Sequence, residues 1–346
     1  MTHKLNINAS PEETTAWQVR FGSTLYGDDS RGNTRPGQEL RIDRVFHWGS
    51  AEWHIPAVYL CGGGVVLDFC ARVERQAMEA FRDKWVPRLQ AGLTGEEQDL
   101  VRLENPLTFA LRPSLTVNGK SLRWNHGSSG CWCPALAEAE PGAENRSIRR
   151  VLEHYGLDRR ENWSVHRMSF PWPSRKLSVR SMLLTMIADD TELPGIRFTA
   201  KAGDTVAFTH PVTGTEYHLT VLETEAVDIP SHFTNADMEY PTHCTAVEYA
   251  VWPDLPQDAL FLRDCCDGDQ PRPKNGGSGR RGAHGAVMGV IRSGKDSETV
   301  MLPDSGTPLL RRSACSSLRF QTPESVEWRI CFRAKLLEAQ TEALID

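Results

Sequence analysis

The stretch Phe46-His47-Trp48-Gly49-Ser50-Ala51-Glu52-Trp53-His54-Ile55 reads almost the same in both directions about Ser50-Ala51. Apolar and polar residues alternate on either side of this centre, as they do in two half-buried strands joined by a tight turn. The symmetry predicts a hairpin with three cross-strand pairs: Trp48 with Trp53, His47 with His54, and Phe46 with Ile55. Because successive strand residues face opposite sides, the two tryptophans share one face and the two histidines the other.

The composition of the whole chain is that of a soluble globular protein. It has 346 residues, of which 40% are hydrophobic and 24% are charged, enough for about two domains. The formal net charge of -6 argues against a general nucleic-acid binder. The polar start lacks a secretory signal pattern, and the longest apolar stretch, 55–69, is interrupted by proline, glycine and aspartate. We therefore expect a cytoplasmic protein without a membrane partner, with most of its nine cysteines as buried thiols.

Short runs of strand-like sequence dominate the chain, so we predict a β-rich α+β fold with mostly antiparallel, sandwich-like or barrel-like sheets. About three helices are expected, over 73–89, 96–103 and 148–155, the last between a Ser147 cap and Gly156. Asn118-Gly119 predicts a two-residue hairpin turn. Segment 127–145 is expected to be a loop, and 335–345 is compatible with a helix. Strands are predicted at 17–25, 39–48, 53–59, 65–69, 108–117, 121–124, 165–170, 177–188, 196–199, 206–209, 217–222, 246–252, 261–263, 287–291, 299–302, 317–320 and 326–332.

Changes in composition suggest the domain organisation. We predict a β-rich unit over 1–125 and a second β-rich unit over 126–270. Residues 271–285, rich in proline, glycine and basic side chains, are expected to form a flexible loop or linker. The strands of 286–346 are expected to return and pack on the core.

The hairpin around Val212-Thr213-Gly214 could hold a metal ion. A three-residue loop would place His210 opposite Glu216 and bring His218 to the same face, whereas a two-residue loop would separate the histidines. His243 could add a third imidazole, with Glu216 or Glu239 as general base. Three ligands and an open position would suit a catalytic zinc ion. The structural alternative is a pair of strand histidines, one of which caps the turn.

Three further groups could carry chemistry, each with a structural alternative. His47 and His54 could bind a metal with Asp43 or Glu52, or form a solvated polar face. Cys131 and Cys133 could ligate a metal or form a labile disulfide, or be ordinary thiols. Exposed tryptophans could stack on a sugar ring or a peptide, or else build the core. The candidates are Trp124, Trp132 and Trp172, in a stretch that also holds Trp163.

Several segments carry a resemblance to a protein family: VFHWGSAEWHIPAVYLCGGGVVLDFC, THPVTGTEYHLTV with EYPTH, and SACSSLRF with VEWRICF. They resemble an uncharacterised protein family of anaerobic clostridial bacteria. The segments are scattered over most of the chain. The resemblance implies a bacterial, cytoplasmic setting and a fold particular to that family, and assigns no activity, cofactor or catalytic residue to any position.

The sequence lacks a phosphate-binding loop, a dinucleotide fingerprint, a nucleophile elbow, a His-Glu-x-x-His motif and an EF-hand. We therefore expect a non-enzymatic binding or interaction protein with a protein or a glycan as partner. Its site would be a shallow aromatic surface without a cluster of perturbed titratable groups. The alternative is a zinc-dependent hydrolase that uses the histidine cluster of 208–243.

Overall fold

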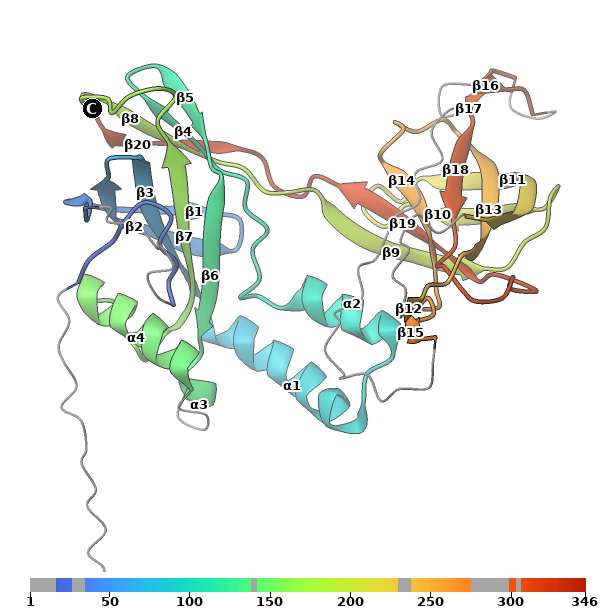
Figure 1. Ribbon diagram of the computed structural model, residues 1–346, viewed down its shortest axis with the longest axis horizontal. Coiled ribbons are helices and arrows are strands. Elements are labelled where there is room, and N and C mark those ends of the chain that lie inside the picture. Colours follow the sequence, from blue (N-terminus) through green and yellow to red (C-terminus); the bar gives the residue numbers. More distant parts are fainter. Residues whose placement is uncertain (1–16, 27–34, 138–141, 230–237, 275–298, 303–305) are drawn as a thin grey trace, which may run out of the picture. The chain divides into compact units, whose positions relative to one another are not determined.

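The computed structural model describes residues 17–26, 35–137, 142–229, 238–274, 299–302 and 306–346. Its contacts divide the chain into two compact units. Unit 1 comprises 1–93, 104–189 and 337–346, and unit 2 comprises 94–103 and 190–336. Strands far outnumber helices, every paired strand is antiparallel, and no sheet in the described ranges closes into a barrel, so the predicted fold class is confirmed (Figure 1). No helix in the described ranges is long and apolar enough to span a membrane.

Unit 1 is built from two packed sheets and a covering helix. The five-stranded sheet has the order β1 (Gln38–Trp48), β2 (Ala51–Leu60), β3 (Gly64–Val73), β7 (Asn162–Pro171) and β6 (His126–Trp132). The four-stranded sheet has the order β20 (Gln340–Ile345), β8 (Met182–Met186), β4 (Ser114–Val117) and β5 (Lys120–Arg123). Side chains such as Phe69 and Leu184 fill the space between the sheets. Helix α4 (Ala143–Tyr155) covers the other face of the larger sheet through Ile148 and Leu152.

Two more helices belong to unit 1. Helix α1 (Arg75–Ala91) has 17 residues but buries only Met78 and Trp85. The short helix α3 (Pro134–Ala137) follows β6. Helix α4 ends at Gly156 in the left-handed conformation, as predicted, but begins five residues before the predicted start at Ile148.

The first hairpin forms with a register different from the predicted one. Its turn is Gly49-Ser50, so Trp48 lies opposite Ala51 and Phe46 lies opposite Trp53. Gly49 has a φ of 64°, a left-handed conformation that suits glycine and permits the turn to start one residue earlier. Each predicted partner is therefore wrong by two positions. Since the strand period is two, the faces are still as predicted, and the rings of Trp48 and Trp53 are 5.9 Å apart.

Unit 2 is a sandwich of two sheets. The four-stranded sheet has the order β10 (Thr205–Thr209), β11 (Glu216–Asp228), β13 (His243–Trp252) and β18 (Arg312–Cys315). The three-stranded sheet has the order β14 (Leu260–Asp264), β19 (Trp328–Ala334) and β9 (Thr191–Phe198). Their inner faces meet in a core that includes Leu219, Tyr249, Trp328 and Phe332. The unit also contains α2 (Gly95–Glu104) except for its last residue, Glu104. Two small strand pairs complete it: β12 (Met238–Glu239) with β15 (Arg272–Pro273), and β16 (Thr299–Val300) with β17 (Leu309–Leu310).

Several sequence predictions are corrected by long-range pairing. The expected loop 127–145 contains most of β6, all of α3 and the start of α4. Its Gly- and Ser-rich part forms a strand because it pairs along β7. Segment 335–345, which the sequence left compatible with a helix, contains β20, which pairs with β8. Segment 17–25 forms no strand, and 317–320 has only a bridge from Arg319 to His243. Residues 275–285 of the expected linker and the expected strand 287–291 lie outside the described residues.

The division between units also differs from the predicted boundary at residue 125. The strands on both sides of that residue belong to the same sheets, because β6 and β7 join β3 while β8 joins β4. The contact pattern places the division at Asp189–Asp190. The C-terminal strands do return, β18 and β19 to unit 2 and β20 to unit 1.

Candidate functional site

The predicted histidine hairpin has a different turn. The N–H of His210 donates to the carbonyl of Thr215, which leaves four residues, 211–214, in the turn. Neither the three-residue nor the two-residue loop considered from the sequence forms, and Ala207 lies opposite His218. In this register His210 and His218 face opposite sides of the sheet. Nδ1 of His210 accepts hydrogen bonds from the N–H groups of Val212 and Thr213, so this imidazole caps the turn.

His243 lies at the far end of the same sheet. Strand β11 pairs with β13 so that His218 is opposite Trp252 and Asp228 is opposite His243. Ten residues of strand separate these two pairs, a distance on the order of 30 Å. The structure therefore does not bring the predicted zinc ligands together. In the part of the chain that the structure describes, no group of three His, Cys, Asp or Glu side chains is placed to hold a metal ion.

The two predicted general bases lie in different sheets. Glu216 lies 4.0 Å from the ring of His218. Glu239, on β12, is 2.6 Å from Nε of Arg272 on β15. The Arg272 guanidinium lowers the pKa of Glu239, which favours a carboxylate held in an ion pair over a tuned proton acceptor.

His47 and His54 do not face each other across the hairpin, and both contact the carboxylate of Glu52. Glu52 lies 3.7 Å from Nε2 of His47 and 2.9 Å from Nε2 of His54. Nε of Arg72 donates to the same carboxylate at 2.9 Å. The hydrogen bond from His54, with help from Arg72, lowers the pKa of Glu52. The hairpin thus has the polar face that the sequence predicted, organised around Glu52, while Asp43 lies in the bulged part of β1.

The three candidate tryptophans do not form one surface. Trp132 is buried and donates to the carbonyl of Arg159, and Trp172 is buried and donates to the carbonyl of Cys61. Both therefore belong to the interior of unit 1. Trp124, between β5 and β6, is 38% exposed and is the single member of the set that a ligand could reach.

A row of Cys131, Ser164 and His166 crosses β6 and β7, and sequence spacing did not reveal it. Cys131 lies opposite Ser164, whose Oγ is 3.0 Å from Nε2 of His166. Burial lowers the pKa of His166 to about 4 and raises the pKa of Cys131. At neutral pH the thiol is protonated and the imidazole is neutral, the opposite of an activated thiolate and imidazolium pair. We interpret the buried Ser164 and His166 as interior packing, with the exposed Cys131 at its margin.

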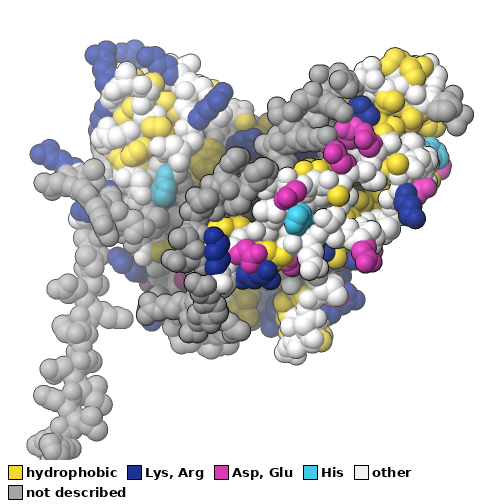
Figure 2. Space-filling model, turned by 45° about the vertical axis from the view of Figure 1, so that its right-hand side comes forward, with side chains coloured by type: hydrophobic (Ala, Val, Ile, Leu, Met, Phe, Trp, Pro, Cys, Tyr) yellow, Lys and Arg dark blue, Asp and Glu magenta, His cyan; other side chains and the backbone are white. Residues whose placement is uncertain are grey.

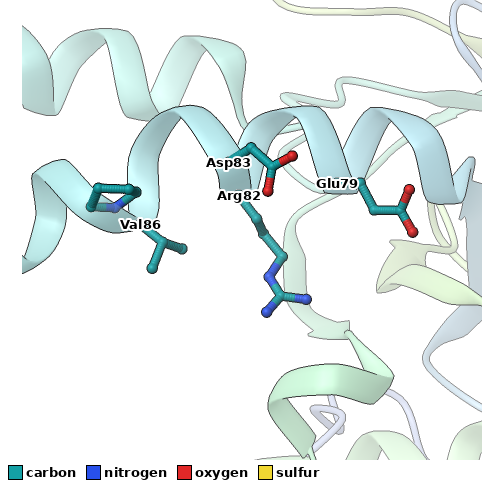
Figure 3. A pocket seen from close by; sticks show the side chains of 5 residues that line it. Glu79, Arg82, Asp83 and Val86 are labelled. Carbon is teal, nitrogen blue, oxygen red and sulfur yellow. The ribbon is translucent and has the colours of Figure 1, made fainter.

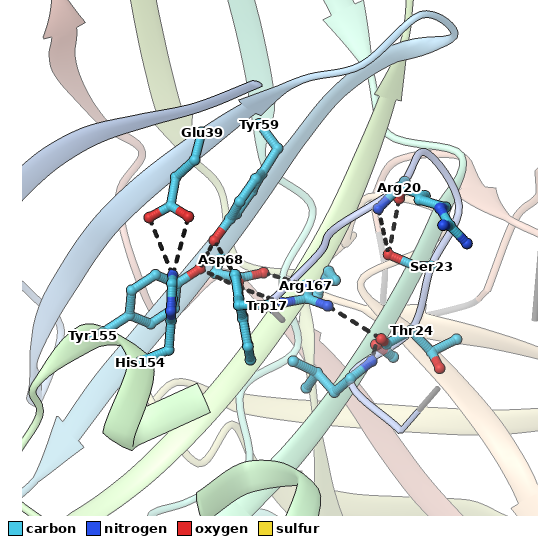
Figure 4. A network of polar contacts seen from close by, with 12 residues as sticks. Trp17, Arg20, Ser23, Thr24, Glu39, Tyr59, Asp68, His154, Tyr155 and Arg167 are labelled. Carbon is cyan, nitrogen blue, oxygen red and sulfur yellow. Dashed lines mark hydrogen bonds and ion pairs between the residues drawn. The ribbon is translucent and has the colours of Figure 1, made fainter. Parts of the chain in front are cut away.

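A buried polar network lies on the helix-covered face of the larger sheet of unit 1 (Figure 4). Asp68 and Arg167 form a two-pronged ion pair with both distances at 2.7 Å. Tyr155 donates its only hydroxyl proton to Asp68, at 2.6 Å, so Tyr59 must donate to Tyr155. The indole N–H of Trp17 then donates to Tyr59.

This network ties two separate segments, 17–26 and helix α4, to the sheet. Arg167 also donates to the carbonyl of Thr24, and Trp17 stacks on His154 with ring centres 4.2 Å apart. His154 in turn contacts Glu39 at 3.0 Å. Burial and the nearby Asp68 carboxylate raise the pKa of Tyr155, so the hydroxyl stays a donor. These contacts hold segment 17–26 and α4 in place. Because Asp68 is fully buried, a substrate has no access to its carboxylate.

A surface depression of about 370 Å³ runs along α1 (Figure 3). The described residues that line it are Glu79, Arg82, Asp83, Val86 and Pro87. All five come from one side of a single helix and mix both charges with apolar groups. Convergent polar groups from several elements, which mark most small-molecule sites, are not found among these five residues.

One exposed aromatic pair does form a surface that a ligand could use. Trp252 is 41% exposed on the outer face of the four-stranded sheet of unit 2, directly opposite His218. Their ring centres are 5.8 Å apart and the planes are tilted by 30°. Thr205 and Thr220 continue this face and share a hydrogen bond between their hydroxyls. The surface is therefore shallow, aromatic at one end and lined by hydroxyls and the carboxylate of Glu216.

Charge is distributed locally on the face of the molecule drawn in Figure 2, where acidic and basic side chains lie in small, interspersed groups.

Comparisons of this chain with known protein families, with curated proteins and with solved structures found no match.

Proposed function

We propose that this chain is a non-catalytic binding protein and that the Trp252–His218 surface of unit 2 binds a glycan. The observation that carries the proposal is the exposed indole of Trp252, directly opposite the exposed imidazole of His218 on a regular sheet face. A flat aromatic ring offers apolar area at little cost in conformational entropy. The C–H face of a sugar ring is a matching partner for it.

Polar groups around the aromatic pair suit the hydroxyls of a sugar. The Oγ1 atoms of Thr205 and Thr220, 3.0 Å apart, can each donate and accept. Glu216 is 70% exposed at its side chain and supplies a strong acceptor beside His218. A planar stacking surface with donors and acceptors at its margin would fix both the position and the orientation of a ring.

Affinity electrophoresis tests the proposal with defined probes. The purified chain is run in native gels that contain hydroxyethylcellulose, xylan, galactomannan or dextran, beside a gel without polysaccharide. We expect at least one polysaccharide to retard the wild-type chain, and we expect Trp252→Ala to migrate as in the blank gel.

Trp124→Ala is the matched control, because Trp124 is exposed to a similar extent, 38% against 41%, but belongs to unit 1. It should be retarded like the wild type. Equal loss of retardation in both variants, or no retardation of the wild type in any gel, would contradict the proposal. Thermal melts of both variants show whether the fold is preserved.

A further inference from the structure

Three arginines lie in one row across the outer face of the three-stranded sheet of unit 2. Arg263 on β14 is directly opposite Arg329 on β19, and Arg329 is directly opposite Arg197 on β9. Neighbouring strands are about 4.8 Å apart, so the backbones of the three arginines lie within about 10 Å. Like charges directly opposite each other destabilise a sheet unless anions offset them.

Arg333 and Phe261 extend this row to form what we call the arginine face: Arg197, Phe261, Arg263, Arg329 and Arg333. The guanidinium carbons of Arg263 and Arg333 lie 5.6 Å and 4.8 Å from the ring centre of Phe261. The aromatic ring holds both side chains in position, through cation–π contact. The two guanidinium groups are thereby presented side by side.

Three carboxylates contact these four guanidinium groups. Glu192 lies 2.6 Å from Arg263 and 3.8 Å from Arg333, and Glu327 lies 3.6 Å from Arg197. The third carboxylate, that of Asp99, comes from helix α2 and is 3.0 Å from Arg329 and 4.0 Å from Arg263. Helix α2 therefore already places a peptide carboxylate on the arginine face.

Solvent reaches most of the arginine face. The side chains of Arg263 and Arg333 are 46% and 45% exposed, whereas Arg329 is 6% exposed. A guanidinium group has five donors in a planar fork that matches a carboxylate. Arg333 contacts Glu192 and has donors left for a second anion, whereas Arg263 contacts both Glu192 and Asp99 and can exchange Asp99 for an incoming carboxylate.

We infer that the arginine face binds an acidic peptide segment of a partner protein, with Asp99 as the internal group that such a segment displaces. The arginine face is complementary in charge to an acidic peptide. Arg329 and Arg263 already contact one carboxylate carried by a helix, that of Asp99. Side chains one turn apart on a helix are about 5–6 Å apart, close to the spacing of the arginines across the strands. This inference does not depend on the proposed Trp252–His218 surface, which lies on the four-stranded sheet of unit 2.

Fluorescence anisotropy with fluorescein-labelled decaglutamate tests the inference on the full-length chain. We expect saturable binding that weakens as salt is raised, because exposed ion pairs are screened. The double variant Arg263→Gln/Arg333→Gln should bind at least about tenfold more weakly, because two charge-assisted contacts are lost. Asp99→Asn should bind several-fold more tightly, since it removes the competing carboxylate.

The matched control is Arg123→Gln/Arg160→Gln, which changes the net charge equally at exposed positions of unit 1. It should retain wild-type affinity, and melts should show all variants folded. The inference is overturned if neither the wild type nor Asp99→Asn binds decaglutamate. It is equally overturned if the two double variants lose the same affinity, or if a labelled single-stranded DNA binds the arginine face as tightly as decaglutamate does.

Discussion

Asp68 and Arg167 lie directly opposite each other on β3 and β7 and form a two-pronged ion pair in the interior of unit 1. Their side chains are 0% and 5% exposed, and Tyr155 donates a further hydrogen bond to the carboxylate. The pair is therefore fully provided with partners, which is the condition under which a buried ion pair is tolerated.

Removal of one partner should strongly destabilise the chain. Asp68→Asn leaves the buried Arg167 without a counter-charge, and we expect it to lower the free energy of unfolding by about 3–5 kcal/mol. Urea unfolding followed by tryptophan fluorescence measures the change. Asp158→Asn, which breaks the exposed pair with Arg160, is the control and should leave the unfolding midpoint nearly unchanged. Equal midpoints for the two variants would show that the buried pair is not essential.

Tyr155→Phe should have a smaller effect than Asp68→Asn. It removes the donor to Asp68 and the acceptor for Tyr59 but keeps the ring that packs against Trp17. We expect a loss of about 1–3 kcal/mol, because one buried hydroxyl is left without its partner. The same urea titration measures it. A loss as large as that of Asp68→Asn would mean that the tyrosine contributes more than these hydrogen bonds.

The buried His166 should make the folded chain less stable in mildly acidic solution. Burial lowers the pKa of His166 to about 4, below its ordinary value of about 6.5. Between these values the unfolded chain binds a proton that the folded chain does not, so the stability that His166 contributes is complete above about pH 6.5 and is lost as the pH falls towards 4. The full loss is about 3 kcal/mol.

The measurement is the difference in unfolding free energy between pH 7 and pH 5 for the wild type and for His166→Gln. The variant should show the smaller acid-induced loss, since glutamine does not titrate in this range. An identical pH dependence in both chains would assign the acid sensitivity to other groups.

Gly195→Ala should destabilise unit 2 for a steric reason. A Cβ at this position would lie 2.8 Å from the ring of Phe332 and 2.9 Å from the carbonyl oxygen of Ile330, at the irregular pairing of β9 with β19. Overpacking against backbone costs about 1–3 kcal/mol. Gly62→Ala, where a Cβ meets no atom within 4 Å, is the control and should melt like the wild type. Calorimetry of both variants measures the difference.

Local chemistry made some elements predictable from the sequence. Asn118-Gly119 adopts positive φ angles and joins β4 to β5, as that dipeptide predicts. Alternation placed Trp48 and Trp53 on one face even though their register was wrong. Gly156 ends α4 because a left-handed residue is needed there. These features depend on neighbours in the chain, which one sequence contains.

The candidate sites depended on distant pairing that the sequence does not specify. From the sequence, His218 and Glu216 were predicted to be part of a metal site. That prediction required a three-residue turn, and a turn one residue longer places His210 on the other face of the sheet from His218. Trp252 is part of the candidate surface because β13 pairs with β11 and places it opposite His218, a pairing between distant parts of the chain.

Composition and local patterns thus determined that this chain is β-rich, that Asn118-Gly119 forms a turn and that Trp48 and Trp53 share an apolar face. Tertiary structure alone decided which strands from distant parts of the chain pair and in what register, the division into units and the enclosed network around Asp68. It also aligned Arg197, Arg263 and Arg329, which come from three separate parts of the chain, in a single row. The reason is physical: strand periodicity is a local property, whereas a partner strand is chosen by packing that includes the whole chain.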